Sequence, residues 1–362
     1  MIKKAALIIS LIATLNAQTL NFIFPFAEEN TTQQNVSEPK PKDLNKTESN
    51  TSKTFLTYEI QTDEEDFNDT YVSFNAKASI AVVINKKRFF KYLPSLMNAL
   101  NAYYSQKGID YQITLYNSDI NISNIKADDI LYFTTDAKDL SKLEDYNKTF
   151  YFPLLNINDS NTTKANFYFG AIDFKAQLNA LTAFIDDKTD IIAENTILSN
   201  KLLSYEKNLT FLNNIYTYPN IYYKDLNNSF VIFNTGAGKT AQVLSKITQK
   251  EIQTKLTLTP QLGYDPLLII LTQPADVEKL LIANSIIHPP LIINESTHLL
   301  SSDIRYNWIN YASCILANKA YNRQNGEDEF YMSDFNIYIF NNQINYKTRL
   351  YRIIDGAFKE VE

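Results

Sequence analysis

From about residue 76 onward, short apolar runs alternate with helical patterns. The run ASIAVVI, residues 78–84, precedes a helical stretch from Phe89 to Tyr104, and Gly108 follows where a helix can end. YQITLY, DILYFTT and FYFPLL are strand-like, and FYFG leads into a helix from Phe174 to Ile185. Crossover helices between parallel strands give this rhythm, so it predicts a mostly parallel sheet with helices on both faces.

A second set of the same kind begins near residue 188. TDIIA leads into a helix around Leu198 to Lys207, and SFVIF into a helix from Lys239. KLTLT, PLLIIL and PLIIN are further strand-like runs, with a helix from Ala275 to Ala283 before the last. Roughly 285 folded residues exceed what one hydrophobic core usually holds. The pattern predicts two lobes, the first from 76–187 and 284–325 and the second from 188–283 and 326–362.

Two patterns near the C-terminus indicate core and turn positions. RYNWINYASCILANKAYN places one apolar stripe on a helix, which favours a core position over a ligand site: Trp308, Tyr311, Ala312, Ile315 and Leu316. Cys314, the only cysteine, is expected to be a small buried hydrophobe. In FNIYIFNNQINYKTRLYRI, two strand-like runs flank Asn341-Asn342, which is a hairpin signal.

The pattern of the N-terminal residues predicts an export signal. Lys3-Lys4, a short apolar run and Ala17 before Gln18 are typical of a secretory signal peptide over residues 1–17, with a membrane anchor as the alternative. Removing it changes the formal charge from −6 to −8, so nothing in the mature chain attracts nucleic acid. We therefore expect a periplasmic protein with no membrane span after signal removal.

Residues 18–75 have a different composition. They contain Ser, Thr, Asn and Gln in quantity and the acidic cluster 63–66, with few aliphatic side chains. Such a segment cannot bury enough apolar surface to offset its ordering entropy, so the composition predicts a disordered tether.

The pattern Asp/Glu-x-Asn-x-Ser/Thr occurs nine times. Asn-x-Ser/Thr is the basic requirement for N-glycosylation of an exported protein, and the acidic residue two places earlier resembles the acceptor pattern of bacterial oligosaccharyltransferases. The alternative is a coincidence of composition. The resemblance implies a glycosylating Gram-negative cell. The nine acceptors are Asn30, Asn45, Asn50, Asn68, Asn121, Asn147, Asn161, Asn208 and Asn227.

The stretch FNTGAGKTAQ raises the question of ATP binding. A phosphate-binding loop reads G-x-x-x-x-G-K-[ST], but the first glycine position is occupied by Phe233. No apolar run ending in Asp supplies the Mg²⁺ partner, and an exported protein meets little ATP. We predict that the chain does not bind ATP, and that GAGKT is a tight turn in which glycine adopts unusual backbone angles.

The sequence contains few residues that could carry out catalysis. His288 and His298 are the only histidines, and no G-x-S-x-G elbow accompanies them. Glu295 and His298 have the spacing of a carboxylate metal site, but the pattern occurs once and further His or Cys ligands are scarce. A pair of glycosidase carboxylates remains an open alternative. We expect no enzyme activity, no catalytic residue, no metal and no cofactor.

Three segments resemble the type I periplasmic-binding-protein-like fold, in particular its envelope members without an obvious transport role (the LppC-like group). They are the stretch ASIAVVINKKRFFKYLPSLMNALNAYYSQKGIDYQITLYNSD, the unit FVIFNTGAGKTAQVLSKI and the late helix IRYNWINYASCILANKAYN. The resemblance covers about residues 76 to 362. It implies two doubly wound Rossmann-like α/β lobes joined by crossing segments, with a cleft between them.

In doubly wound sheets, ligands bind beyond the carboxyl ends of the strands, near helix N-termini. The residues expected there are Asn85, Lys86, Lys87, Arg88, Thr135, Asp136, Glu194, Asn195, Asn234, Thr235, Lys239 and Thr240. The three basic residues 86–88 are expected to form the positive edge of an anion-accepting cleft that faces Asn234, Thr235 and Lys239. The sequence thus predicts a non-catalytic protein that binds a small molecule or an envelope protein. The alternatives are a solute receptor for a transporter and a carbohydrate-active enzyme.

Overall fold

The computed structural model describes residues 78–160, 164–287, 289, 291–300, 302–327 and 330–361. The predicted signal peptide and tether lie outside the described residues. So do His288 and five of the acceptor asparagines: Asn30, Asn45, Asn50, Asn68 and Asn161.

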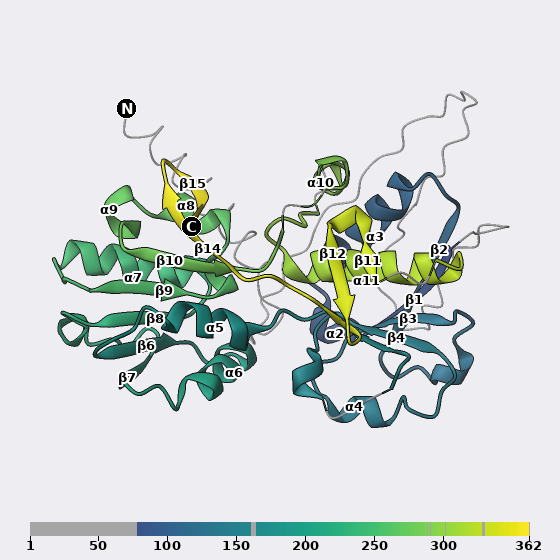
Figure 1. Cartoon of the computed structure of the whole chain (residues 1–362), viewed down its shortest axis with the longest axis horizontal. Helices are drawn as coiled ribbons and strands as arrows, with labels where there is room; N and C mark the ends of the chain where they lie inside the picture. The colour runs from purple at the N-terminus through teal and green to yellow at the C-terminus, as the bar shows by residue number, and fades with distance from the viewer. Residues whose placement is uncertain are drawn as a thin grey trace, which may run out of the picture. The chain divides into compact units, whose positions relative to one another are not determined.

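The first lobe is built on an eight-stranded sheet with the order β11-β12-β13-β5-β4-β3-β1-β2. Its parallel strands are β1 (Ala78–Ile84), β2 (Tyr111–Asn117), β3 (Asp129–Tyr132), β4 (Thr149–Phe152) and β5 (Phe167–Phe169). Its other strands are β11 (Tyr331–Met332), β12 (Ile337–Phe340) and β13 (Gln343–Ile344). Its helices are α2 (Lys86–Phe89), α3 (Leu93–Gln106), α4 (Lys138–Ser141), α10 (Leu291–Leu299) and α11 (Trp308–Gln324) (Figure 1). Short 3₁₀ turns are η1 (Ile122–Asn124), η2 (Ile157–Asp159) and η5 (Ser333–Phe335).

The second lobe repeats this plan around a seven-stranded sheet with the order β15-β14-β10-β9-β8-β6-β7. Its parallel strands are β6 (Thr189–Ala193), β7 (Leu212–Thr217), β8 (Phe230–Asn234), β9 (Leu256–Thr259) and β10 (Leu280–Asn284). The antiparallel strands β14 (Arg349–Ile354) and β15 (Ala357–Val361) extend it. Its helices are α5 (Phe174–Thr182), α6 (Ile197–Glu206), α7 (Ala237–Gln249), α8 (Pro266–Leu271) and α9 (Pro274–Val277), with the 3₁₀ turns η3 (Tyr223–Leu226) and η4 (Gln261–Gly263) (Figure 1).

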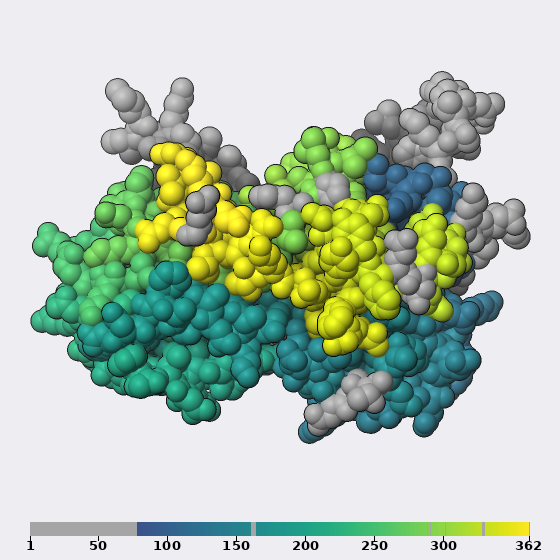
Figure 2. Space-filling model, viewed as in Figure 1, coloured from purple at the N-terminus to yellow at the C-terminus, as the bar shows by residue number. Residues whose placement is uncertain are grey.

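The chain passes between the two sheets three times. It leaves the first sheet after β5, returns after β10, and leaves again between β13 and β14. The C-terminal segment, yellow in Figure 2, therefore contributes surface to both lobes. The predicted class, two doubly wound α/β lobes joined by crossing segments, is confirmed.

Both sheets share one topological feature that positions a site. In the first sheet β1 lies between β2 and β3, and in the second β6 lies between β7 and β8. The strand order therefore reverses beside β1 and beside β6. In doubly wound sheets this switch point leaves a crevice at the carboxyl ends of the two strands that flank it.

Several sequence predictions about the core and the turns are confirmed. The stripe from Trp308 to Leu316 is buried in the core of the first lobe, and Cys314 is fully buried there as well. Gly108 follows α3 with φ of 64°, the left-handed conformation expected after a helix C-terminus. Asn341 and Asn342 have φ of 47° and 62°, and they join β12 to β13 in the predicted hairpin.

Three predicted elements of the second set are wrong. PLLIIL is the helix α8, because Asp265 caps its N-terminus through the N–H of Leu267 and Pro266 occupies its first position. The helix expected over 275–283 is the short α9 followed by the buried strand β10. Within PLIIN, Leu291 to Asn294 form the first turn of the helix α10 instead of a strand. Short apolar runs fit either a helix or a strand, so in PLLIIL the capping residue Asp265 favours the helix.

Sheet membership also differs from the expected lobe boundaries. The stretch that follows α11 contains β11, β12 and β13, which belong to the first sheet instead of the second. Helix α5 packs against β10 of the second sheet, although its residues were expected in the first lobe. Among the described residues, no helix combines the length and the apolar character that crossing a membrane requires.

Candidate functional site

The predicted residues after β1 form the capped start of α2. Asn85 accepts a hydrogen bond from the N–H of Arg88 at 2.9 Å, and the N–H of Lys86 donates to the Asn117 side chain at 3.0 Å. Lys87 is exposed, and the guanidinium of Arg88 lies 5.5 Å from the ring centroid of Phe89. Asn85 thus acts as a helix cap, while the basic side chains border the switch point of the first sheet.

The loop after β3 is held by its own hydrogen bonds. Thr134 donates to the Asp139 carboxylate at 2.6 Å and accepts from the N–H of Asp136 at 3.1 Å. Asp136 is exposed and accepts from the N–H of Lys138 at 2.9 Å, and Thr135 is half-buried beside it. Thr135 and Asp136 therefore lie at the same switch point as Asn85, because β3 is the neighbour of β1.

At the second switch point, Glu194 occupies the N-terminus of α7. One carboxylate oxygen accepts from the N–H of Gly236 at 3.1 Å, and the other pairs with the ammonium of Lys239. Unpaired N–H groups at a helix N-terminus attract anions. The carboxylate of the protein itself meets that demand here, so the position that a bound phosphate takes in a phosphate-binding loop is already filled.

The neighbouring predicted residues are directed into the protein. Asn234, Thr235 and Thr240 are fully buried. Asn234 donates to the Glu206 carboxyl group, and the hydroxyls of Thr235 and Thr240 are hydrogen-bonded to each other at 2.9 Å. These three side chains stabilise the turn and expose no surface to a ligand, whereas Asn195 is exposed.

The structure thus gathers the predicted residues into two clusters, one at each switch point. The hydrogen bonds described above stay within each lobe. The expected opposition of Lys86, Lys87 and Arg88 to Lys239 across the lobes stays a prediction.

The glycines of GAGKT adopt ordinary backbone conformations. Gly236 has φ of −64° and ψ of 158°, and Gly238 lies inside α7. The expectation that glycine is needed there for unusual backbone angles is therefore wrong.

We predict that ATP causes no rise in the melting temperature of the protein, because Glu194 already satisfies Gly236 and Lys239. Thermal unfolding with and without ATP and Mg²⁺ measures this, with Lys246→Ala as a control at an exposed lysine of the same helix. An ATP-dependent rise that disappears in Lys239→Ala but persists in Lys246→Ala would contradict the prediction.

A cavity lies away from the predicted residues. Its volume is about 400 Å³. It is lined by Asn156, Asn158, Asp159, Ile172, Asp173, Phe174, Lys175, Lys201 and Tyr205. These come from the loop after β4, from the first crossing segment with the start of α5, and from one face of α6. Residues attached to both sheets therefore line one cavity.

Polar contacts across the cavity join the two lobes. Asp159 forms an ion pair with Lys201 and accepts a hydrogen bond from the Tyr205 hydroxyl at 3.2 Å. Asn158 donates to Asp173 at 3.4 Å, and Asp173 also caps α5 through the N–H of Ala176 at 2.9 Å. Burial, with a contribution from the charge of Asp159, raises the pKa of Tyr205, so its hydroxyl stays protonated.

Sequence reasoning missed this site because its residues come from three separate stretches and match no motif. One signal was present: Lys201 and Tyr205 are four residues apart on a predicted helix, and they therefore share a face. Their partner Asp159 lies in a loop whose position only the folded chain defines.

The described residues include no group of three His, Cys, Asp or Glu side chains that could hold a metal ion. His298 and Glu295 lie exposed on α10, and Ser296 between them donates to the Gln106 side chain at 3.1 Å.

Comparison with solved structures identifies the fold as that of the type I periplasmic-binding-protein-like proteins. An extracellular ligand-binding receptor from Desulfohalobium retbaense superposes with a TM-score of 0.59 at 10% identity, covering 79% of this chain and 59% of the receptor. A branched-chain amino acid ABC transporter protein from Thermus thermophilus, with bound valine, gives a TM-score of 0.56 at 13% identity over 79% of this chain and 95% of that one. Haemophilus influenzae LpoA gives a TM-score of 0.50 at 10% identity, covering 81% of this chain and 59% of LpoA. No protein-family model matches the chain, and no curated protein matches its sequence.

Proposed function

We propose that the protein is a non-catalytic, periplasmic glycoprotein of the cell envelope that binds a ligand or an envelope partner. The observation that carries the proposal is the cavity, because residues attached to both sheets line it. Ligand sites in proteins are typically concave, formed between lobes or domains, and provided with a few convergent polar groups.

The lining of the cavity sets the chemistry of the expected ligand. Lys175 and Lys201 supply positive charge, and Asp159 and Asp173 supply negative charge. Ile172 and Phe174 add an apolar wall. A ligand that fits must therefore carry both hydrogen-bond donors and acceptors around a small apolar part.

The ion pair between Lys201 and Asp159 connects such a ligand to the arrangement of the lobes. Lys201 is on α6 beside the second sheet, whereas Asp159 follows β4 of the first. A bound molecule that contacts either group competes with or reinforces this pair. Binding is then expected to be coupled to how the two lobes are held together.

We predict that Lys201→Met weakens ligand binding about ten- to a hundredfold, because a hydrogen bond to a charged group contributes ~1.5–3 kcal/mol. Native mass spectrometry of protein purified from its own envelope gives the measurement, as the fraction that retains a bound small molecule. Lys207→Met is the matched control, because Lys207 is exposed at the C-terminus of the same helix.

Two results would contradict this assignment. If wild type and Lys201→Met retain the same molecule to the same extent, the cavity is not its site. If no molecule is retained and the pure protein cleaves peptidoglycan or another glycan, the protein is a carbohydrate-active enzyme instead.

A solute receptor for a transporter is the second candidate function. It is favoured by the match to the Thermus thermophilus transporter protein, of which this chain spans 95%. A small solute released on addition of a cognate membrane transporter would favour the receptor, whereas a protein that co-purifies in place of a solute would favour the envelope partner.

Glycosylation and export are part of the same proposal, and they rest on the nine acceptor patterns and the signal-like N-terminus. The side chains of the four acceptors within the described residues support it, since all four are exposed: Asn121, Asn147, Asn208 and Asn227.

A further inference from the structure

The four acceptor asparagines within the described residues are all exposed, but the residues that flank them differ in exposure. The basic acceptor requirement is Asn with a hydroxyl residue two places after it, and the bacterial acceptor pattern that these sites resemble adds an acidic residue two places before Asn. A transferase that reads the pattern must contact all three side chains at once. The exposure of the flanking residues therefore decides which sites remain readable in the folded chain.

At Asn208 the acidic residue is hidden. Glu206 is 1% exposed near the C-terminus of α6 and is hydrogen-bonded to Asn234. Burial also raises the pKa of Glu206 to about 8, so the side chain is largely uncharged at neutral pH. A transferase finds no accessible carboxylate at this site while α6 stays folded.

At two other sites the hydroxyl residue is hidden. Thr149, the hydroxyl residue of the Asn147 site, is 8% exposed and begins β4. Strand β4 lies between β3 and β5 in the first sheet. Ser229, which serves Asn227, is fully buried, and its hydroxyl donates to the carbonyl of Leu226 at 2.8 Å. Reading either site requires the chain to open next to a central strand.

Asn121 differs from these three. Asp119, Asn121 and Ser123 are all exposed in the segment after β2, where Asn121 caps the 3₁₀ turn η1. The Asn121 side-chain oxygen accepts from the N–H of Ser123 at 3.0 Å. That contact uses the oxygen and leaves the amide nitrogen, the atom that would carry the sugar, on the exposed side chain.

We propose that the folded protein is glycosylated at Asn121, and that Asn147, Asn208 and Asn227 are glycosylated only before the chain folds. This inference rests on the proposed glycoprotein and deepens it. It concerns the described acceptors alone.

The donor class is an oligosaccharide linked to a polyprenyl pyrophosphate. The amide nitrogen of Asn121 forms a bond to the anomeric carbon of the first sugar, and the bond from that carbon to the pyrophosphate oxygen breaks. The amide loses one proton, and the polyprenyl pyrophosphate leaves with the electron pair of the broken bond. No oxidant or reductant is needed.

Local opening explains why the other three sites close on folding. Segments open with free energies that range from near zero in loops to the full stability of the domain in central strands. Thr149 is the first residue of the central strand β4, Ser229 directly precedes the central strand β8, and Glu206 is hydrogen-bonded to Asn234 at the end of β8. The exposure of Asn147, Asn208 and Asn227 alone therefore does not predict that they are glycosylated in the folded protein.

The test uses the full chain made in a host without the transferase, together with synthetic peptides that span each of the four sites. Both are incubated with a bacterial oligosaccharyltransferase and a polyprenyl-pyrophosphate oligosaccharide. Each site is read separately by peptide mass spectrometry after digestion. We expect modification of all four peptides, but of Asn121 alone among the four sites in the folded chain.

Variants sharpen the test. Asp119→Asn is expected to abolish modification of Asn121 in the folded chain. Asp145→Asn, the matched change at the Asn147 site, is expected to leave the pattern of the folded chain unchanged while it abolishes modification of the corresponding peptide.

The possible failures are distinguishable. If no peptide is modified, and no site carries glycan in protein from its own envelope, the glycoprotein proposal fails. If the peptides are modified but the folded chain accepts glycan at Asn147, Asn208 or Asn227 as fast as at Asn121, the present inference is overturned. The present inference is also overturned if Asn121 is modified in its peptide but not in the folded chain.

Discussion

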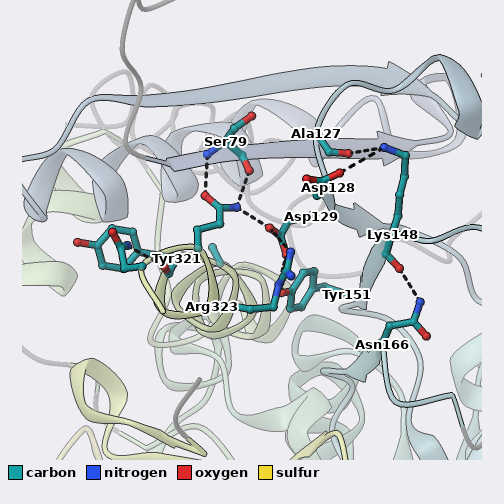
Figure 3. A network of polar contacts seen from close by, with 12 residues as sticks. Ser79, Ala127, Asp128, Asp129, Lys148, Tyr151, Asn166, Tyr321 and Arg323 are labelled. Carbon is teal, nitrogen blue, oxygen red and sulfur yellow. Dashed lines mark hydrogen bonds and ion pairs between the residues drawn. The ribbon is translucent and has the colours of Figure 1, made fainter. Parts of the chain in front are cut away.

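Replacing Asp129 by asparagine is expected to destabilise the first lobe by about 1–3 kcal/mol, the range for leaving buried polar groups without their hydrogen-bond partner. Asp129 is 1% exposed at the start of β3. Figure 3 shows its carboxylate where β3, β4 and the last turn of α11 meet. Loss of its charge therefore affects three elements at once.

Four donors saturate the carboxylate of Asp129. Arg323 donates through Nε at 3.0 Å and through Nη2 at 2.7 Å, Gln324 donates at 2.6 Å, and the Tyr151 hydroxyl donates at 2.7 Å. An asparagine offers one acceptor oxygen and adds an NH₂ group that faces these donors. Arg323 would lose its charged partner, but its side chain is 34% exposed and stays partly solvated, so most of the cost comes from the hydrogen bonds that asparagine cannot accept.

Gln324 extends the network to a third strand. Its side chain accepts from the N–H of Ser79 at 2.9 Å and donates to the carbonyl of Ser79 at 2.8 Å. Asp129 thereby orients the Gln324 side chain, which fixes the start of β1 to the end of α11. The variant should loosen the contact between this helix and the sheet.

Denaturant unfolding followed by tryptophan fluorescence measures the effect. Trp308 is the only tryptophan in the chain, and it is buried in the core of the first lobe. The matched control is Asp128→Asn, because the neighbouring side chain of Asp128 is 81% exposed and lies 3.9 Å from Lys148. A change within about 0.5 kcal/mol is expected for the control. Equal effects of the two variants would show that the buried network is not needed.

The sequence predicts most of the fold because strand-like runs and helix-capping residues are local signals. Gly108 and the pair Asn341-Asn342 adopt the positive φ that their types favour. PLLIIL forms the helix α8 instead of the predicted strand, since apolar runs of this length suit helix and strand alike. The sequence predicts a single strand-like run after Asn342, whereas the structure divides it into β13 and β14, which belong to different sheets and are separated only by tertiary pairing.

The candidate site was harder to predict. The rule that ligands bind at the carboxyl ends of strands led to residues at both switch points. It could not show that Glu194 fills the N-terminus of α7, since that contact joins the segment after β6 to the one after β8. The same rule could not predict the cavity, because Asp159 and Lys201, which pair there, are 42 residues apart in the sequence.

The stability of the protein is expected to fall as the pH rises, because of Glu206 in the second lobe. Burial raises the pKa of its carboxyl group to about 8 from an ordinary value of 4.5, although the hydrogen bond from Asn234 acts in the opposite direction. The folded chain therefore holds a proton that the unfolded chain releases. The stability gained from that proton is fully present below pH 4.5 and is lost as the pH rises to 8.

The hydrogen bonding around Glu206 agrees with an uncharged side chain. Its second oxygen and the side-chain oxygen of Asn234 are both buried without a hydrogen-bond partner. Two acceptors that lack a donor are unfavourable in a buried position. A proton on Glu206 supplies a donor, and a glutamine would supply one permanently through its NH₂ group.

Glu206→Gln is therefore expected to stabilise the protein at high pH and to flatten its pH dependence. The wild type should lose about 2–4 kcal/mol more than the variant between about pH 5 and pH 8, since each unit of pKa shift corresponds to ~1.4 kcal/mol. Thermal or urea unfolding of both proteins across this range gives the difference directly. Glu278→Gln, at an exposed glutamate of the same lobe, serves as the control and should follow the wild type. If Glu206→Gln is instead less stable than the wild type at pH 8, Glu206 is ionised in the folded chain, and its carboxylate stabilises the end of β8 through Asn234.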